Sequence, residues 1–123
     1  MNYQDKITLV LGASPKAERY SNAAVKLLRE YGHPMIAVGR RQGTINSTPI
    51  QTELPENTAI DTVTLYLGPH NQTDYYEYLR RLKPRRVIFN PGTFNDELKE
   101  MLEKEDIECI EHCTLVMLRS NEY

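Results

Sequence analysis

The residues best suited to chemistry lie in one short polar loop near the start of the chain. An apolar run over residues 7–11 is followed by Gly12-Ala13-Ser14, and Arg19 and Ser21 come soon after. Gly12 permits a tight turn, and the small Ala13 and Ser14 leave room for a close ligand. The hydroxyl and guanidinium groups suit phosphate oxygens. We therefore expect a phosphate site between a buried strand and the start of a helix.

That loop differs from the dinucleotide fingerprint G-x-G-x-x-G, because it has a single glycine. An ordinary strand–helix turn with a solvated arginine is the alternative interpretation. Similar polar turns follow the other apolar runs, and the carboxyl ends of parallel strands share one edge of a sheet. The candidate ligand-binding residues at this edge are Gly12, Ala13, Ser14, Arg19, Tyr20, Ser21, Gly39, Arg40, Arg41, Leu67, Gly68, His70, Asn90, Pro91, Gly92 and Cys113.

Arg40 and Arg41 bear on the type of nucleotide. A site for NAD places an acidic residue at the end of the second strand, where it accepts hydrogen bonds from the ribose hydroxyls. Two arginines there favour a ribose that carries an extra phosphate, as in NADP and coenzyme A. A solvated basic turn is the alternative.

Catalytic and metal-binding sets are not evident in the sequence. We expect His33 in a solvated turn, whereas His70 lies at the ligand edge and His112 adjoins Cys113. A neighbouring thiol and imidazole could activate each other, but sequence neighbours often point apart. Cys109, Cys113 and His112 are too few and unsuitably spaced for structural zinc. We therefore expect no metal site and no catalysis by this chain alone.

The elements that must position these residues alternate between strands and helices. Apolar runs predict strands at residues 7–11, 34–38, 61–67, 86–90 and 107–110, with a short edge strand or hairpin near Ile45 and Ile50. Helical spacing predicts a first helix at 20–31, a second that ends at about residue 82, and a third that starts at Asn95. A short fourth helix is expected at 113–118. On the first helix we expect a continuous inner face from Tyr20 to Tyr31. The pattern indicates an α/β fold: a Rossmann-like doubly wound parallel sheet of about five or six strands in a three-layer αβα arrangement.

Composition narrows the class of partner. The chain has 123 residues, enough for one domain with its own core. Its 15 basic and 17 acidic residues argue against a nucleic-acid-binding face, and we read the basic run at residues 80–86 as a solvated face. No apolar run approaches a membrane span. With two cysteines and no signal-like N-terminal segment, we expect a cytoplasmic protein.

The motifs also resemble a known family. Gly12-Ala13-Ser14-Pro15, followed by Arg19 and Ser21, resembles the first loop of the small stand-alone CoA-binding proteins. These share their domain with the CoA-binding part of the succinyl-CoA synthetase alpha subunit. Asp61-Thr62-Val63, Asn90-Pro91-Gly92-Thr93 and Cys113 are also similar to that family, so the resemblance spans residues 6–118. The second strand departs from it, because Ala37-Val38-Gly39-Arg40 stands where the family often has a Pro-Val-Asn-Pro-like sequence.

The resemblance implies a single CoA-binding Rossmann-like domain over residues 1–123. It would bind coenzyme A or an acyl-CoA through the Gly12–Ser14 loop and the nearby arginines, without catalysis of its own. The thiol of a bound CoA could then approach Cys113. An NADP-binding oxidoreductase-like protein is the main alternative, although no substrate domain or placed proton donor accompanies the nucleotide motif. A scaffold with a degenerate pocket is a third possibility. The expected partner is a small nucleotide, with no nucleic acid and no membrane, and a homodimer or an unidentified protein partner is left open.

Overall fold

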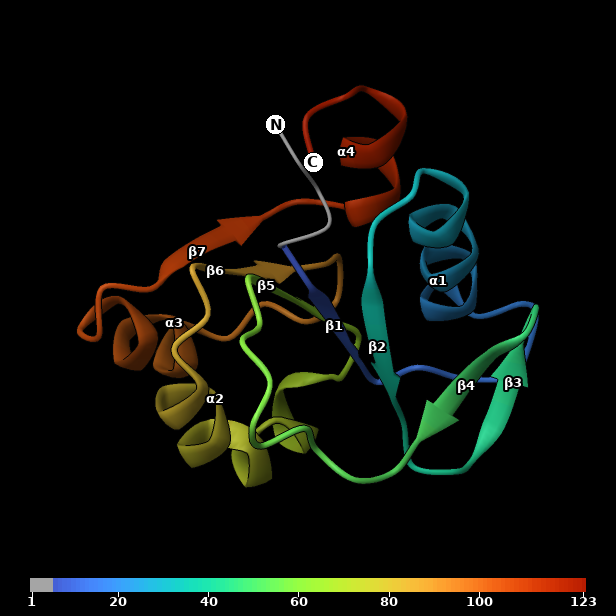
Figure 1. The fold of residues 1–123 in the computed structure, drawn as a ribbon. Helices are drawn as coiled ribbons and strands as arrows, with labels where there is room; N and C mark the ends of the chain where they lie inside the picture. The colour runs from blue at the N-terminus through green and yellow to red at the C-terminus, as the bar shows by residue number, and fades with distance from the viewer. Residues whose placement is uncertain (1–5) are drawn as a thin grey trace.

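The computed structural model describes residues 6–123 and contains a seven-stranded sheet (Figure 1). Its order is β3-β4-β2-β1-β5-β6-β7, and every neighbouring pair is parallel except β3 and β4. The strands are β1 Thr8–Leu11, β2 Met35–Val38, β3 Gly43–Ile45, β4 Thr48–Gln51, β5 Thr62–Leu65, β6 Arg86–Phe89 and β7 Glu108–Glu111. Without β3, this is the Rossmann order 3-2-1-4-5-6, with the switch point between β1 and β5. The predicted fold class is confirmed, and the hairpin near Ile45 and Ile50 adds the antiparallel strand.

Helices cover both faces of the sheet (Figure 1). The helices are α1 Tyr20–Glu30, α2 Tyr76–Leu82, α3 Asp96–Glu103 and α4 Thr114–Arg119, and 3₁₀ turns at Pro69–Asn71 and Thr73–Tyr75 precede α2. Helices α1 and α4 contact each other on one face, and α2 and α3 contact each other on the other. No helix among residues 6–123 is long and apolar enough to cross a membrane.

The core lies on both sides of the central strands, which explains their unbroken apolar runs. Alternate residues of β1 separate into two clusters: Leu9 and Leu11 pack with Val63 and Phe89 beneath α2 and α3, whereas Val10 packs on the α1 side. Several expectations about single residues are wrong. Tyr20 is 76% exposed and Tyr31 is also exposed, because α1 buries the face that carries Ser21, Val25 and Leu28 instead.

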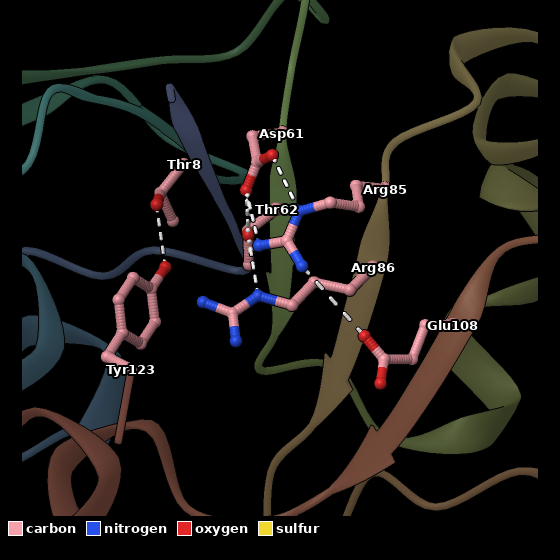
Figure 2. A network of polar contacts seen from close by, with 7 residues as sticks. All are labelled: Thr8, Asp61, Thr62, Arg85, Arg86, Glu108 and Tyr123. Carbon is pink, nitrogen blue, oxygen red and sulfur yellow. Dashed lines mark hydrogen bonds and ion pairs between the residues drawn. The ribbon is translucent and has the colours of Figure 1, made fainter. Parts of the chain in front are cut away.

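The amino edge of the sheet carries a polar network (Figure 2). The Arg85 guanidinium donates two hydrogen bonds to the Asp61 carboxylate, from Nε to Oδ1 at 2.9 Å and from Nη2 to Oδ2 at 3.1 Å. Burial alone would raise the pKa of Asp61, but hydrogen bonds from Arg85 and Thr62 outweigh burial and lower the pKa. The neighbouring Arg86 is only 7% exposed, so it does not belong to a solvated face. Its Nε donates to Thr62 Oγ1, and its guanidinium carbon lies 4.6 Å from the centre of the Tyr123 ring.

His33 also departs from expectation, because it is only 9% exposed rather than solvated. Its ring packs edge-on against Tyr123, with the ring centres 4.9 Å apart. Tyr123 in turn shares a 2.6 Å hydrogen bond with Thr8 (Figure 2). A contact from the last residue to β1 could not be read from local spacing, which explains why the burial of His33 was not predicted.

The opposite, carboxyl edge brings backbones into direct contact. A Cβ on Gly39 would lie 2.2 Å from the carbonyl oxygen of Ala13, and one on Gly12 would lie 3.0 Å from the Tyr66 carbonyl. Gly12 also has a φ of +100°, which side chains rarely adopt. The amides of Gly12 and Ala13 both donate to the Val38 carbonyl at 2.9 Å. These contacts fix the loop against the ends of β2 and β5.

We predict that Gly39→Ala destabilises the protein by about 2 kcal/mol or more, because backbone atoms must shift to accept the methyl group. Urea unfolding followed by circular dichroism measures the loss. Gly68→Ala is the matched control: its Cβ would meet only the His70 side chain at 3.4 Å, so it should cost less than about 1 kcal/mol. Equal stability of the two variants would show that the close approach at Gly39 does not affect the free energy of unfolding.

Candidate functional site

The carboxyl edge of the sheet is hollowed into an open cleft of about 520 Å³. This volume lies in the range of small-molecule sites, and the cleft sits at the β1/β5 switch point, where open α/β sheets bind their ligands. The cleft is lined by Gly12, Ala13, Ser14, Pro15, Lys16, Arg19, Tyr20, Ser21, Arg40, Arg41, Tyr66, Leu67, Gly68, Pro91, Gly92 and Thr93.

We call the part formed by the β1–α1 loop and the end of β2 the charged half. It presents four exposed cations, which are Lys16, Arg19, Arg40 and Arg41. None of these forms an ion pair with another residue among 6–123, and no lining residue is acidic. The charged half is therefore suited to an anion.

The start of α1 adds to this charge. Tyr20 and Ser21, the first residues of the helix, both line the cleft. No side chain caps this end of the helix and its first turn holds no acidic residue, so the positive end of the helix dipole faces the cleft uncompensated. The preceding loop is held in place because Asn22 Nδ2 donates to the Ser14 carbonyl at 3.0 Å, and Ser14 Oγ accepts from the Lys16 amide at 3.1 Å.

We call the part formed by the ends of β5 and β6 the uncharged half. Its lining residues are Tyr66, Leu67, Gly68, Pro91, Gly92 and Thr93. Burial raises the pKa of Tyr66 to about 12, and the nearby hydroxyls of Thr64 and Thr114 offset this only in part. Those two hydroxyls bond each other at 2.8 Å, and the Tyr66 hydroxyl has no well-formed partner among the described residues. Tyr66 is therefore neutral at physiological pH.

Twelve of the sixteen candidate residues named from the sequence line the cleft, and four do not: Gly39, His70, Asn90 and Cys113. Gly39 instead packs closely against the Ala13 carbonyl oxygen. Asn90 is 2% exposed, and its amide is committed to the Thr64 hydroxyl, the Leu65 carbonyl and the Thr114 amide. It therefore holds β5, β6 and α4 together beneath the cleft.

His70 and Cys113 lie beyond the lining. His70 is exposed beside Gly68, and Cys113 is half-buried at the start of α4. The Cys113 backbone amide donates to His112 Nδ1 at 2.8 Å, so this ring nitrogen bonds the main chain and not the thiol. Residues 6–123 contain no group of three or more His, Cys, Asp or Glu side chains able to hold a metal ion.

Four lining residues were not among the candidates: Pro15, Lys16, Tyr66 and Thr93. Lys16 carried a usable signal, because it is a cation between two residues of the predicted phosphate loop. Pro15 and Thr93 each come directly after a named candidate, Ser14 and Gly92. Tyr66 lies within the apolar run predicted as a strand at 61–67, and nothing in its neighbourhood distinguishes it from a core residue.

Comparison with known proteins identifies related chains. A family model described as a CoA binding domain matches residues 6–119. A crystal structure of an uncharacterized protein is 47% identical, with 96% of this chain and 98% of that chain covered and a TM-score of 0.92. A hypothetical protein from Pyrococcus horikoshii is 25% identical over 99% of this chain and 91% of that one, with a TM-score of 0.80. A Thermus thermophilus protein of 22% identity shares the fold over the full length of both chains, with a TM-score of 0.84. No curated protein matches.

The two cysteines should differ in reactivity. Burial raises the pKa of the Cys109 thiol to about 11, so at pH 8 about one in a thousand of these thiols is ionised. We predict that iodoacetamide at pH 8 alkylates the folded protein at Cys113 and reaches Cys109 only in urea, as intact-mass analysis would show. Cys109→Ser should leave native labelling unchanged and Cys113→Ser should remove it. Native labelling that follows Cys109 would contradict the prediction.

Proposed function

The chain belongs to the CoA-binding domain family, and we propose that its cleft binds coenzyme A or an acyl-CoA. The observation that carries this proposal is the charged half of the cleft. Four cations without carboxylate partners meet an uncapped helix start there, although the chain as a whole has a net charge of -2. A ligand with several phosphates balances that charge.

The distribution of charge along the cleft supports one orientation of the ligand. Coenzyme A has an adenosine end with a 3′-phosphate, a central pyrophosphate and an uncharged pantetheine arm. In the proposed arrangement Arg40 and Arg41 meet the 3′-phosphate, because arginine forks match phosphate oxygens. The pyrophosphate lies on the Gly12–Ser14 loop at the start of α1. The arm then crosses the uncharged half, which has no charge to desolvate.

We propose binding without chemistry by this chain alone. No histidine, cysteine, aspartate or glutamate lies among the residues that line the cleft. Such side chains most often act as general acids and bases. The cleft also has the hydroxyls of Ser14, Ser21 and Thr93, but no carboxylate or imidazole among the lining residues stands ready to activate them as nucleophiles. Tyr66 does not replace them, because burial raises its pKa to about 12 and keeps it protonated.

An NADP-binding protein is the second candidate, and it rests on the same arginines. Arg40 and Arg41 follow β2, where a Rossmann domain that takes NADP places an arginine against the 2′-phosphate. NADP differs from coenzyme A in replacing the flexible arm with a nicotinamide ribose. The two ligands can therefore be separated by direct titration.

The affinity for coenzyme A should depend on its 3′-phosphate. We predict that CoA binds at least about tenfold more tightly than dephospho-CoA, because a charge-assisted hydrogen bond contributes about 1.5–3 kcal/mol. Isothermal titration calorimetry of the wild-type protein with both ligands measures the ratio. Equal affinities would remove the 3′-phosphate from the site, and tighter binding of NADP than of CoA would favour the second candidate.

The phosphate loop should be sensitive to negative charge. We predict that Ser14→Asp abolishes CoA binding, because it places a carboxylate beside the proposed pyrophosphate, while an acid near a helix start leaves the fold intact. Ser47→Asp is the control, since it adds the same charge at an exposed turn with a φ of +73°, which aspartate tolerates. Calorimetry and thermal melting report binding and folding separately. Intact CoA binding by folded Ser14→Asp would place the phosphates elsewhere.

A further inference from the structure

Gln72 is a polar side chain with no exposed surface, in the segment that leads into α2. Its Nε2 donates to two carbonyl oxygens, of Leu67 at 2.8 Å and of Thr93 at 2.7 Å. Its Oε1 accepts from Asn95 Nδ2 at 3.0 Å. Every partner lies on the β5–α2 connection or the β6–α3 connection, so a single amide joins the two.

The orientation of this amide is fixed by its surroundings. Both carbonyls can only accept, so the nitrogen of Gln72 must face them. On the other side, Asn95 uses its Oδ1 to cap α3 at the Leu98 amide and its Nδ2 to donate to Gln72 and to the Tyr76 hydroxyl. The network is therefore consistent in only one arrangement, which makes the joint between the loops rigid.

Leu67 and Thr93, the two residues whose carbonyls are held, both line the uncharged half of the cleft. We propose that Gln72 is a positioning residue for the ligand: it sets the separation of the two loops between which the pantetheine arm of coenzyme A lies. This inference rests on the proposed function. Gln72 does not touch the ligand, because it is fully buried and is not part of the lining.

The hydrogen bond from Gln72 to the Leu67 carbonyl also orients the backbone N–H of Gly68. In a planar trans peptide the C=O and N–H groups point in opposite directions. When the Leu67 carbonyl is turned toward Gln72, the Gly68 N–H of the same peptide unit is turned away from it. That N–H donates to no group within residues 6–123, and Gly68 lines the cleft. It is therefore available to an amide carbonyl of the arm.

A purely structural reason for Gln72 is weaker. Its three hydrogen bonds end on the cleft loops and on the cap of α3, and none reaches a strand of the core. An amide is needed at this position only because the Leu67 and Thr93 carbonyls turn toward it, and an apolar side chain of similar volume would leave both carbonyls without this donor. A buried amide here is best explained by the placement of the loops.

The experiment compares two ligands in wild type and Gln72→Met, which preserves side-chain length and removes both polar atoms. Coenzyme A reports the whole cleft, and adenosine 3′,5′-bisphosphate reports only the charged half. We expect Gln72→Met to bind CoA at least about tenfold more weakly and to bind the bisphosphate within about twofold of wild type. Calorimetry at a temperature where thermal melting shows each variant folded measures both affinities.

Two further variants separate positioning from general destabilisation. Tyr78→Phe is the control: it removes a similarly buried bond on α2, from the Tyr78 hydroxyl to the Pro55 carbonyl at 2.7 Å, at a residue that does not line the cleft. It should change neither affinity. Asn95→Asp keeps the oxygen that caps α3 but loses the amide that holds Gln72 Oε1. It should weaken CoA selectively, and it tests the inference even if Gln72→Met does not fold.

The outcomes are distinct. Selective loss of CoA in Gln72→Met or in Asn95→Asp, with Tyr78→Phe unchanged, supports the positioning role. Unchanged CoA binding in folded Gln72 and Asn95 variants overturns it while leaving the proposed function intact. An equal loss of both ligands also overturns it, because Gln72 would then support the fold as a whole. If the wild type binds neither ligand, the proposed function fails and this inference fails with it.

Discussion

The close approach of three strand ends is the constraint on which the site depends. At the carboxyl edge of the sheet, β2 touches the β1–α1 loop through Gly39, and that loop touches the end of β5 through Gly12. A Cβ on Gly39 would clash with the Ala13 carbonyl, and one on Gly12 would be tight against the Tyr66 carbonyl. The two loop amides that share the Val38 carbonyl tie the turn to β2. Part of the cleft wall therefore consists of peptide groups whose positions are set by the sheet. Helix α1 follows this loop, so its first residues also line the cleft.

Cations at the two edges of the sheet differ in whether they have acidic partners. At the amino edge, Arg85 is paired with Asp61, and the neighbouring Arg80, Arg81 and Lys83 meet glutamates. At the carboxyl edge, the cations of the charged half have no such partners among residues 6–123. The first group is neutralised within the fold and adds little to stability when exposed. The second group repels itself until an anion is present, which favours a ligand that carries phosphates.

Much of the fold could be predicted because local signals agreed with it. The apolar run before Gly12 and the Asn95 cap of α3 each reflect short-range physics, and most of the lining follows from the rule that parallel strands end at one edge. The errors arose where a distant part of the chain decides. Tyr123 buries His33 and Arg86 from the end of the sequence. The Asn90 side chain, predicted at the ligand edge, accepts a hydrogen bond from the Thr114 amide of α4, a contact that local spacing does not show. Gln72 gives no sequence signal, since its partners come from three separate positions.

The division of the cleft follows from how the two kinds of interaction depend on distance. Attraction between a phosphate and a cation falls off slowly, so long exposed side chains such as Lys16 and Arg41 can adjust without losing it. A hydrogen bond to an uncharged amide weakens steeply once the distance or angle changes. Hydrogen bonds to an uncharged arm therefore require fixed protein groups, and backbone donors meet that requirement if their peptide planes are fixed. The Gln72 amide fixes the plane that contains the Gly68 N–H. In the proposed arrangement, the flexible cations face the phosphates of coenzyme A and the rigid peptide groups face its uncharged arm.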